Sequence, residues 1–195
     1  MTQGSRGTTI ATVCTLQGGN RLLSAVRFAM LFHCSISAHD PARVAGTIAA
    51  IWRGEAHPFP PVEGAWIALA GDDRGTAIEV HPFGIDMLPG TTETAYAHNP
   101  AAPEHSTSHQ AIATQLTEVE VLAIAAREGW RALHCNRGPF EVIEVWLENR
   151  ILVEVLTAEM QQQYLAFITP ANWRLYLQEH GVPGSGEAVS IRHQD

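Results

Sequence analysis

His33-Cys34-Ser35-Ile36 recurs 76 residues later as His109-Gln110-Ala111-Ile112, and the two stretches share the pattern H-x-x-I. The same shift places Ile48-Ala49-Ala50 on Ile124-Ala125-Ala126. Structural repeats bury surfaces that a single copy would leave exposed, so they are expected to share one core. Matches in the same order at one shift therefore predict two copies of a single module.

The first module is expected to span residues 30–82 in the order β-α-β-β-β. Asp40 fits a helix N-cap and Pro41 the first helical position, and the helix should run to about Trp52. Val44, Ile48 and Ile51 recur at helical spacing and form one apolar stripe that can pack on a sheet. Strands are expected at 31–38, 57–61, 65–70 and 76–81, the second of them an irregular edge strand because its prolines cannot donate hydrogen bonds.

The second module is expected to span residues 108–157 with the same order. Thr117-Glu118-Val119-Glu120 fits a capping box, and Gly129 is a suitable end for the helix that follows. Strands are expected at 108–114, 131–136, 140–147 and 151–157. The two modules therefore have the same predicted topology.

The rest of the chain lies outside the modules. Residues 83–107 are rich in Pro, Gly, Thr and Ala without periodicity, so we expect a linker there. Residues 158–195 are expected to form short helices and a loose tail. Residues 1–29 are expected to be a disordered leader. Their arginines and lack of acidic residues also fit a transit segment, and Met30 would suit an internal start.

Composition excludes several classes of protein. All 12 basic residues are arginines, so a Walker lysine or a Schiff-base lysine is impossible, and the net charge of -8 argues against a nucleic-acid partner. No apolar run is long enough to span a bilayer, so no membrane partner is expected. The 3 cysteines form no C-x-x-C pair, which favours a reducing, cytoplasmic location.

Four residues at equivalent repeat positions are candidate metal ligands. Successive side chains of a strand face opposite sides of a sheet, so His33 lies on a small polar face with Ser35. A shift of 75 residues places Glu79 on Glu154, each on the last strand of its module, while His109 is the counterpart of His33. A carboxylate in an apolar strand is costly unless it is paired or binds a cation. Two imidazoles and two carboxylates would suit a divalent transition metal.

At these residues the sequence resembles the vicinal oxygen chelate superfamily, whose members include glyoxalase I, extradiol dioxygenases and the fosfomycin and bleomycin resistance proteins. The resemblance covers residues 30–157. It implies an α+β fold in which two β-α-β-β-β modules form a curved mixed sheet, here followed by short C-terminal helices. It also implies metal ligation by His33, Glu79, His109 and Glu154, an order most similar to that of glyoxalase I.

The resemblance implies a divalent-metal-dependent isomerase or lyase in which the metal polarises an oxygen of a small substrate. The metal is expected to be zinc, nickel, cobalt, manganese or iron(II). Glu154 and Glu79 are the candidate catalytic bases. Leu152 and Leu156 lie on the same face as Glu154 and give it an apolar setting, which favours it over Glu79.

Several alternatives stay open. Trp66, Trp146 and Phe140 could line a cup that binds a small molecule or an antibiotic without metal, and an extradiol-type dioxygenase is a further alternative. Glu144 either lines this cup or pairs with an arginine. The modules could pair within one chain or between two chains of a homodimer. The remaining histidines, including His81, have no repeat counterpart and are expected in loops or at the surface.

Overall fold

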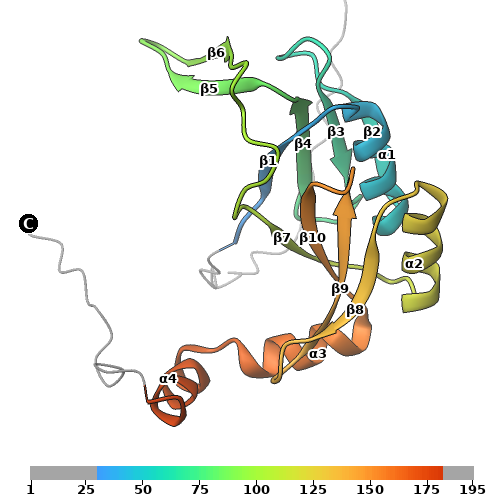
Figure 1. The fold of residues 1–195 in the computed structure, drawn as a ribbon, viewed down its shortest axis with the longest axis vertical. Helices are drawn as coiled ribbons and strands as arrows, with labels where there is room; N and C mark the ends of the chain where they lie inside the picture. The colour runs from blue at the N-terminus through green and yellow to red at the C-terminus, as the bar shows by residue number, and fades with distance from the viewer. Residues whose placement is uncertain (1–29, 182–195) are drawn as a thin grey trace, which may run out of the picture. The chain divides into compact units, whose positions relative to one another are not determined.

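The computed structural model describes residues 30–181 (Figure 1). The first module consists of β1 (His33–Ala38), α1 (Pro41–Trp52), β2 (Glu55–Pro58), β3 (Trp66–Leu69) and β4 (Ala77–Pro82). The second consists of β7 (Gln110–Ala113), α2 (Glu118–Arg127), β8 (Ala132–Asn136), β9 (Glu141–Leu147) and β10 (Ile151–Leu156). β5 (Ile85–Pro89) and β6 (Thr94–His98) lie between them, and α3 (Ala158–Phe167) and α4 (Pro170–Glu179) follow. The expected leader lies outside the described residues.

Each module forms one mixed four-stranded sheet. The strand orders are β1-β4-β3-β2 and β7-β10-β9-β8, which are the same order in the two modules. The first strand pairs in parallel with the last in each module, and the other pairs are antiparallel. The predicted α+β fold with two β-α-β-β-β modules is confirmed.

The repeat extends to the register of the strands. Ser35 of β1 lies opposite Glu79 of β4, and Ala111 of β7 lies opposite Glu154 of β10. Ser35 and Ala111 each follow a candidate histidine by two residues. Histidine and glutamate therefore hold the same relative position in the two sheets.

The predicted helix starts are confirmed in atomic detail. The side chain of Asp40 accepts a hydrogen bond from the main-chain N–H of Arg43, with proline at the next position. Thr117 and Glu120 form both hydrogen bonds of a capping box, which satisfies two main-chain donors at the start of α2. Local sequence alone is enough to set these two boundaries.

A close approach of the main chain fixes the turn after α1. A Cβ atom added at Gly54 would lie 2.0 Å from the carbonyl oxygen of Leu69 in β3, and main chain cannot move aside as a side chain could. We expect Gly54→Ala to lower the free energy of unfolding by about 2–3 kcal/mol, the range for steric overpacking, in urea unfolding. Gly46→Ala is the control, because it lies on α1 with nothing within 4 Å of the added Cβ. The control should be neutral or slightly stabilising, and a neutral Gly54→Ala would contradict the close contact.

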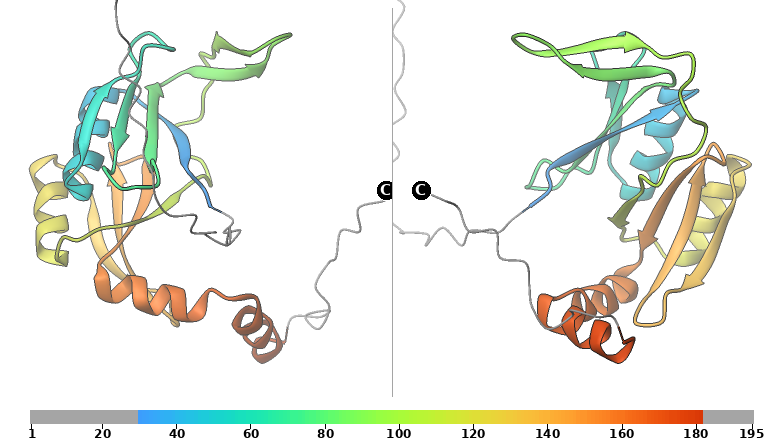
Figure 2. Two further views of the ribbon diagram at one scale, coloured as in Figure 1. Left: turned by 180° about the vertical axis from the view of Figure 1, so that it is seen from behind. Right: turned by 60° about the vertical axis from the view of Figure 1, so that its left-hand side comes forward.

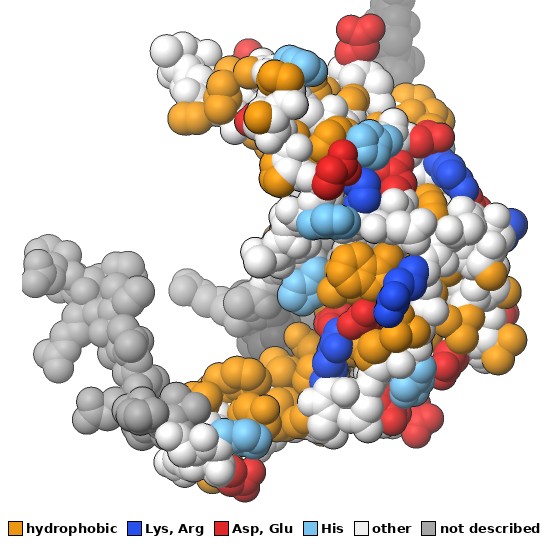
Figure 3. Space-filling view, viewed as in Figure 1, with side chains coloured by type: hydrophobic (Ala, Val, Ile, Leu, Met, Phe, Trp, Pro, Cys, Tyr) orange, Lys and Arg blue, Asp and Glu red, His pale blue; other side chains and the backbone are white. Residues whose placement is uncertain are grey.

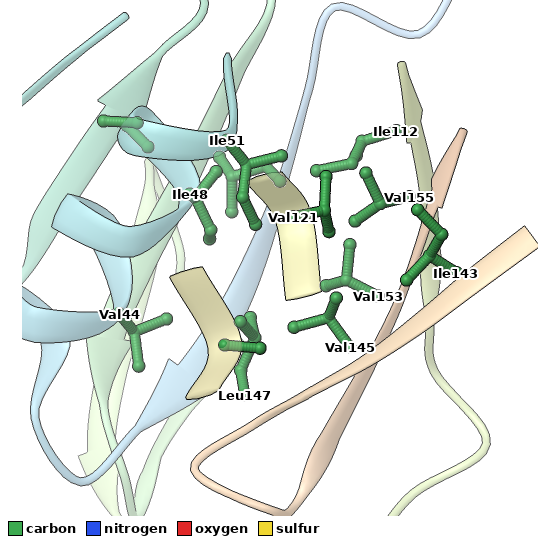
Figure 4. Packing of buried hydrophobic residues seen from close by; sticks show 14 of the residues in the cluster. Val44, Ile48, Ile51, Ile112, Val121, Ile143, Val145, Leu147, Val153 and Val155 are labelled. Atoms are coloured by element: carbon green, nitrogen blue, oxygen red, sulfur yellow. The ribbon is translucent and has the colours of Figure 1, made fainter. Parts of the chain in front are cut away.

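The two modules share one hydrophobic core. Val44, Ile48 and Ile51 of α1 are fully or almost fully buried, as the predicted stripe requires. They belong to the same cluster as Val121 of α2 and Val153 of β10 (Figure 4). Figure 2 shows α1 (blue) beside α2 (yellow), and the two helices are in contact. Burial of this surface therefore couples the stability of the modules.

Polar contacts between the modules reach both ends of α1. At its start, the carboxylate of Glu148 accepts hydrogen bonds from the main-chain N–H groups of His39 and Asp40, at 2.8 and 2.7 Å. At its end, the buried hydroxyl of Thr114 donates to the carbonyl oxygen of Ile51. The second module thus satisfies main-chain groups that α1 leaves without helical partners.

The segment 83–107, expected to be a linker without regular structure, contains the β5–β6 hairpin. Met87, Leu88 and Tyr96 are exposed, so the hairpin has no buried face whose alternation would reveal a strand in the sequence. Gly90 lies in its turn, where an added Cβ would meet the carbonyl oxygen of Glu93 at 2.2 Å. The strands of this hairpin were therefore not predictable from hydrophobic alternation in the sequence.

The predicted C-terminal helices are present in the described residues. Thr157 and Thr169 cap α3 and α4, respectively. α3 packs on the second sheet, where Tyr164 contacts Phe140 edge to face at 5.0 Å between ring centroids. None of the described helices has the length and hydrophobicity needed to cross a membrane.

Candidate functional site

The first module brings two of the predicted ligands together. His33 opens β1 with its side chain 59% exposed, and its Nε2 lies 3.9 Å from Oε1 of Glu79. The other carboxylate oxygen of Glu79 accepts a hydrogen bond from the Ser35 hydroxyl at 2.8 Å and lies 3.3 Å from Nε2 of His81. We call His33 and Glu79 the first half-site.

His81 was expected at the surface or in a loop, and this prediction is wrong. The residue is 3% exposed and lies between the rings of Phe59 and Tyr96. Its Nε2 is aimed at Glu79, while its Nδ1 is buried without a hydrogen-bond partner. The signal was present in the sequence, because His81 follows Glu79 by two residues on one strand and therefore shares its face.

The second module places Glu154 on β10 opposite Ala111 and Glu144. The Glu154 side chain is 11% exposed. Nη2 of Arg137 lies 2.6 Å from Oε1 of Glu154 and 2.6 Å from Oε1 of Glu144, and Nε also donates to Glu154 at 3.1 Å. In Figure 3, basic and acidic side chains lie next to each other over the region of β9 and β10. One guanidinium therefore compensates two carboxylates.

Burial and ion pairing shift the pKa values of Glu144, Arg137 and Cys135. Burial opposes ionisation of Glu144, but hydrogen bonds from Arg137 and the Trp146 indole outweigh it, so the pKa of Glu144 lies below its usual value. Hydrogen bonds to Glu154 and then Glu144 raise the pKa of Arg137. Burial, followed by the charge of Glu144, raises the pKa of the Cys135 thiol. Of the two roles open to Glu144, pairing with an arginine is the one observed.

His109 lies one residue before β7 and is exposed, with Nδ1 3.3 Å from the carbonyl oxygen of Thr107. Within residues 30–181, no three His, Cys, Asp or Glu side chains lie close enough together to hold a metal ion. The four predicted ligands therefore do not meet at one point in a single chain. We call His109 and Glu154 the second half-site.

The donor types and the geometry of the first half-site fit a divalent metal. Two ligand atoms bound to one tetrahedral zinc ion at about 2.1 Å lie roughly 3.4 Å apart. The 3.9 Å between His33 and Glu79 is close to this separation, so a small side-chain movement would let them share an ion. The second half-site offers the same donor types, but Arg137 already occupies its carboxylate. The first half-site therefore fits a metal by donor type and distance, whereas the second matches it in donor type alone.

A cavity of about 300 Å³ adjoins the first half-site. Its polar lining consists of four serines and one histidine, Ser35, Ser37, His81, Ser106 and Ser108, and its apolar lining of Ile36, Ile85, Met87 and Ile151. Hydroxyl groups set among apolar side chains are typical of sites for small oxygenated molecules.

No protein-family model matches the sequence, and no curated protein matches it. Solved structures similar to the chain include two FosX fosfomycin resistance proteins. FosX from Listeria monocytogenes is 14% identical with a TM-score of 0.47, and the match covers 72% of this chain and 100% of that one. FosX from Mesorhizobium loti is 11% identical with a TM-score of 0.43, covering 70% and 98%.

A third similar structure is an integron cassette protein from V. cholerae, which is 10% identical with a TM-score of 0.39, covering 67% of this chain and 97% of that one. One Listeria FosX structure was determined with Mn(II) and 1S,2S-dihydroxypropylphosphonic acid. Fosfomycin resistance proteins are one of the groups that the sequence resemblance includes.

Proposed function

We propose that the protein is a divalent-metal-dependent, glyoxalase-like enzyme of isomerase or lyase type, acting on a small oxygenated substrate. Its metal ligands would be His33, Glu79, His109 and Glu154. The observation that carries the proposal is the pairing of His33 with Glu79 at 3.9 Å, in the same register that relates His109 to Glu154. A histidine and a glutamate at matching positions in both modules support a metal site more strongly than one isolated residue on a strand would.

The proposed chemistry is a proton transfer next to a carbonyl. A bound divalent ion would supply Lewis acidity that polarises a substrate oxygen. Glu154 is the proposed base, because its nearly buried carboxylate shares a strand face with Leu156, and it would accept a proton only when Arg137 no longer holds it. Glu79 is the second candidate. Glu79 would keep its orientation through the Ser35 hydroxyl, beside the cavity that would receive the substrate.

We propose that a second copy of the chain completes the site. The half-sites are not joined within one chain, so His33 and Glu79 of one copy would meet His109 and Glu154 of another. A symmetric pair of chains would then contain two equivalent sites. This arrangement predicts one metal ion per chain and loss of metal when the pair dissociates.

The proposed setting is the cytoplasm, with a small molecule as the substrate. Cys34 and Cys135 are free thiols, which suits a reducing compartment. Burial, followed by the charge of Glu79, raises the pKa of the Cys34 thiol, so Cys34 is not poised as a nucleophile.

The metal-binding prediction uses full-length protein purified without an affinity-tag metal. We expect it to bind about one zinc, nickel, cobalt, manganese or iron(II) ion per chain, with at least one of these metals. His33→Ala and His109→Ala should each weaken binding about 10-fold or more in isothermal titration calorimetry, since each removes one direct ligand. The matched control is His134→Ala, because His134 pairs with Glu118 instead of a candidate ligand. If none of the five metals binds, the proposed function is wrong.

A second candidate is a binding protein that needs no metal. Arg137 favours this metal-free candidate, because the arginine already compensates Glu144 and Glu154 without a metal ion. The cavity beside the first half-site would hold the ligand. Ligand binding that persists after chelation and in His33→Ala would support this candidate over the enzyme. Binding abolished by a chelator would exclude it.

A further inference from the structure

We propose that Arg137 is an internal cation that closes the second half-site, so that a divalent metal reaches Glu154 only when the guanidinium leaves. This inference rests on the proposed function and assigns to Arg137 the control of metal affinity. Metal and guanidinium would compete for one carboxylate oxygen, Oε1 of Glu154, which already accepts hydrogen bonds from both Nε and Nη2 of Arg137.

The position of Arg137 is set by the turn between β8 and β9. Its main-chain N–H donates to the carbonyl oxygen of Phe140, and the next residue, Gly138, has a φ of 88° that favours glycine. From this fixed backbone the side chain reaches across the sheet to the neighbouring strands β9 and β10. The guanidinium therefore lies on the same sheet face as Glu154.

The two half-sites differ in this respect. Among the described residues, Glu79 contacts a hydroxyl and two histidines but no arginine. Glu154 instead contacts a guanidinium with two nitrogen atoms. A fork of charge-assisted hydrogen bonds is stronger than a single neutral one, so it is the second half-site that resists a metal.

Arg137 is also able to leave. Its side chain is 34% exposed, whereas those of Glu144 and Glu154 are 14% and 11% exposed. The guanidinium can thus move into solvent without crossing the packed core, while the carboxylates stay in place. Departure without a replacement cation would leave two nearly buried carboxylates uncompensated, and a divalent ion would supply that replacement.

The experiment titrates manganese or zinc into full-length wild-type protein, Arg137→Gln and Arg137→Lys. We expect Arg137→Gln to bind metal about 10-fold or more tightly than wild type, because the competitor is gone. Arg137→Lys retains a charge but loses the fork, so its affinity should lie between the two. Arg131→Gln is the matched control, because Arg131 is a neighbouring arginine without an ion pair in the described part of the chain.

Thermal denaturation gives a readout independent of catalysis. Without metal, Arg137→Gln should melt below wild type, and saturating metal should raise its melting temperature by more than it raises that of wild type. The gain in affinity should vanish in Arg137→Gln combined with Glu154→Gln, which locates the competition at Glu154. If Arg137→Gln does not fold, the metal affinity of Arg137→Lys is compared with that of wild type. Equal affinities would then overturn the inference.

The outcomes separate this inference from the proposed function. Metal binding of equal strength in wild type and the Arg137 variants would overturn the inference and leave the function standing. Measurable binding by wild type together with binding about 10-fold or more tightly by Arg137→Gln would support both. Absence of binding in every variant would overturn both.

Discussion

Ile48→Ala should lower the free energy of unfolding by about 3–4 kcal/mol, as is typical for truncation of a fully buried aliphatic side chain. Ile48 is 0% exposed and belongs to the core cluster shared by both modules. The loss combines the transfer free energy of the removed methyl and methylene groups with the cost of the cavity left behind. Urea unfolding followed by circular dichroism and tryptophan fluorescence measures it.

The same variant tests whether the modules unfold together. Because the core joins α1 to α2 and the second sheet, both probes should report one transition at one urea concentration. Val119→Ala is the control, since Val119 lies on α2 with 76% of its surface exposed and should change the stability little. Two separate transitions in the Ile48 variant would contradict a shared core.

Glu148→Ala should cost about 2–3 kcal/mol of unfolding free energy, within the range for losing hydrogen bonds to a charged acceptor. Its side chain is 10% exposed, accepts from the main-chain N–H groups of His39 and Asp40, and pairs with Arg150 at 3.4 Å. The anion at the start of α1 also interacts favourably with the helix dipole. Glu148 therefore stabilises the contact between modules and not only its own turn.

Hydrogen exchange and two further variants test whether the Glu148 carboxylate acts at the start of α1. Amide hydrogen exchange should accelerate at His39 and Asp40 in Glu148→Ala more than at the ends of α2. Glu148→Gln keeps one acceptor oxygen and should lose less stability, while Glu63→Ala, at an exposed site, should be near neutral. Unchanged exchange at the start of α1 would show that the carboxylate does not cap it.

Much of the fold was predictable because its signals are local. Asp40 and Thr117 define helix starts by hydrogen bonds that span three residues. Val44, Ile48 and Ile51 define a buried stripe by helical spacing alone. The β5–β6 hairpin lacked such a signal because its large apolar side chains are exposed.

The candidate site was predictable only in part. Strand alternation placed His33 on the face of Ser35, and the same rule applied to His81 would have identified it as a neighbour of Glu79. The pairing of Ser35 with Glu79 came only from the register of the two strands. No rule of spacing connects Arg137 with Glu154, because the arginine lies in a turn and reaches past β9 to its partner on β10.

The sequence by itself determined which residues repeat, which helices and strands the two modules form, and which residues share a strand face with Glu79 and Glu154. These properties follow from backbone geometry with a period of two or 3.6 residues. Only the tertiary structure decided the partners of each carboxylate. A nearly buried charge takes whichever compensating group the chain brings within reach, and that depends on contacts between distant segments. Glu79 thus lies beside His33 and His81, whereas Glu154 is held by Arg137.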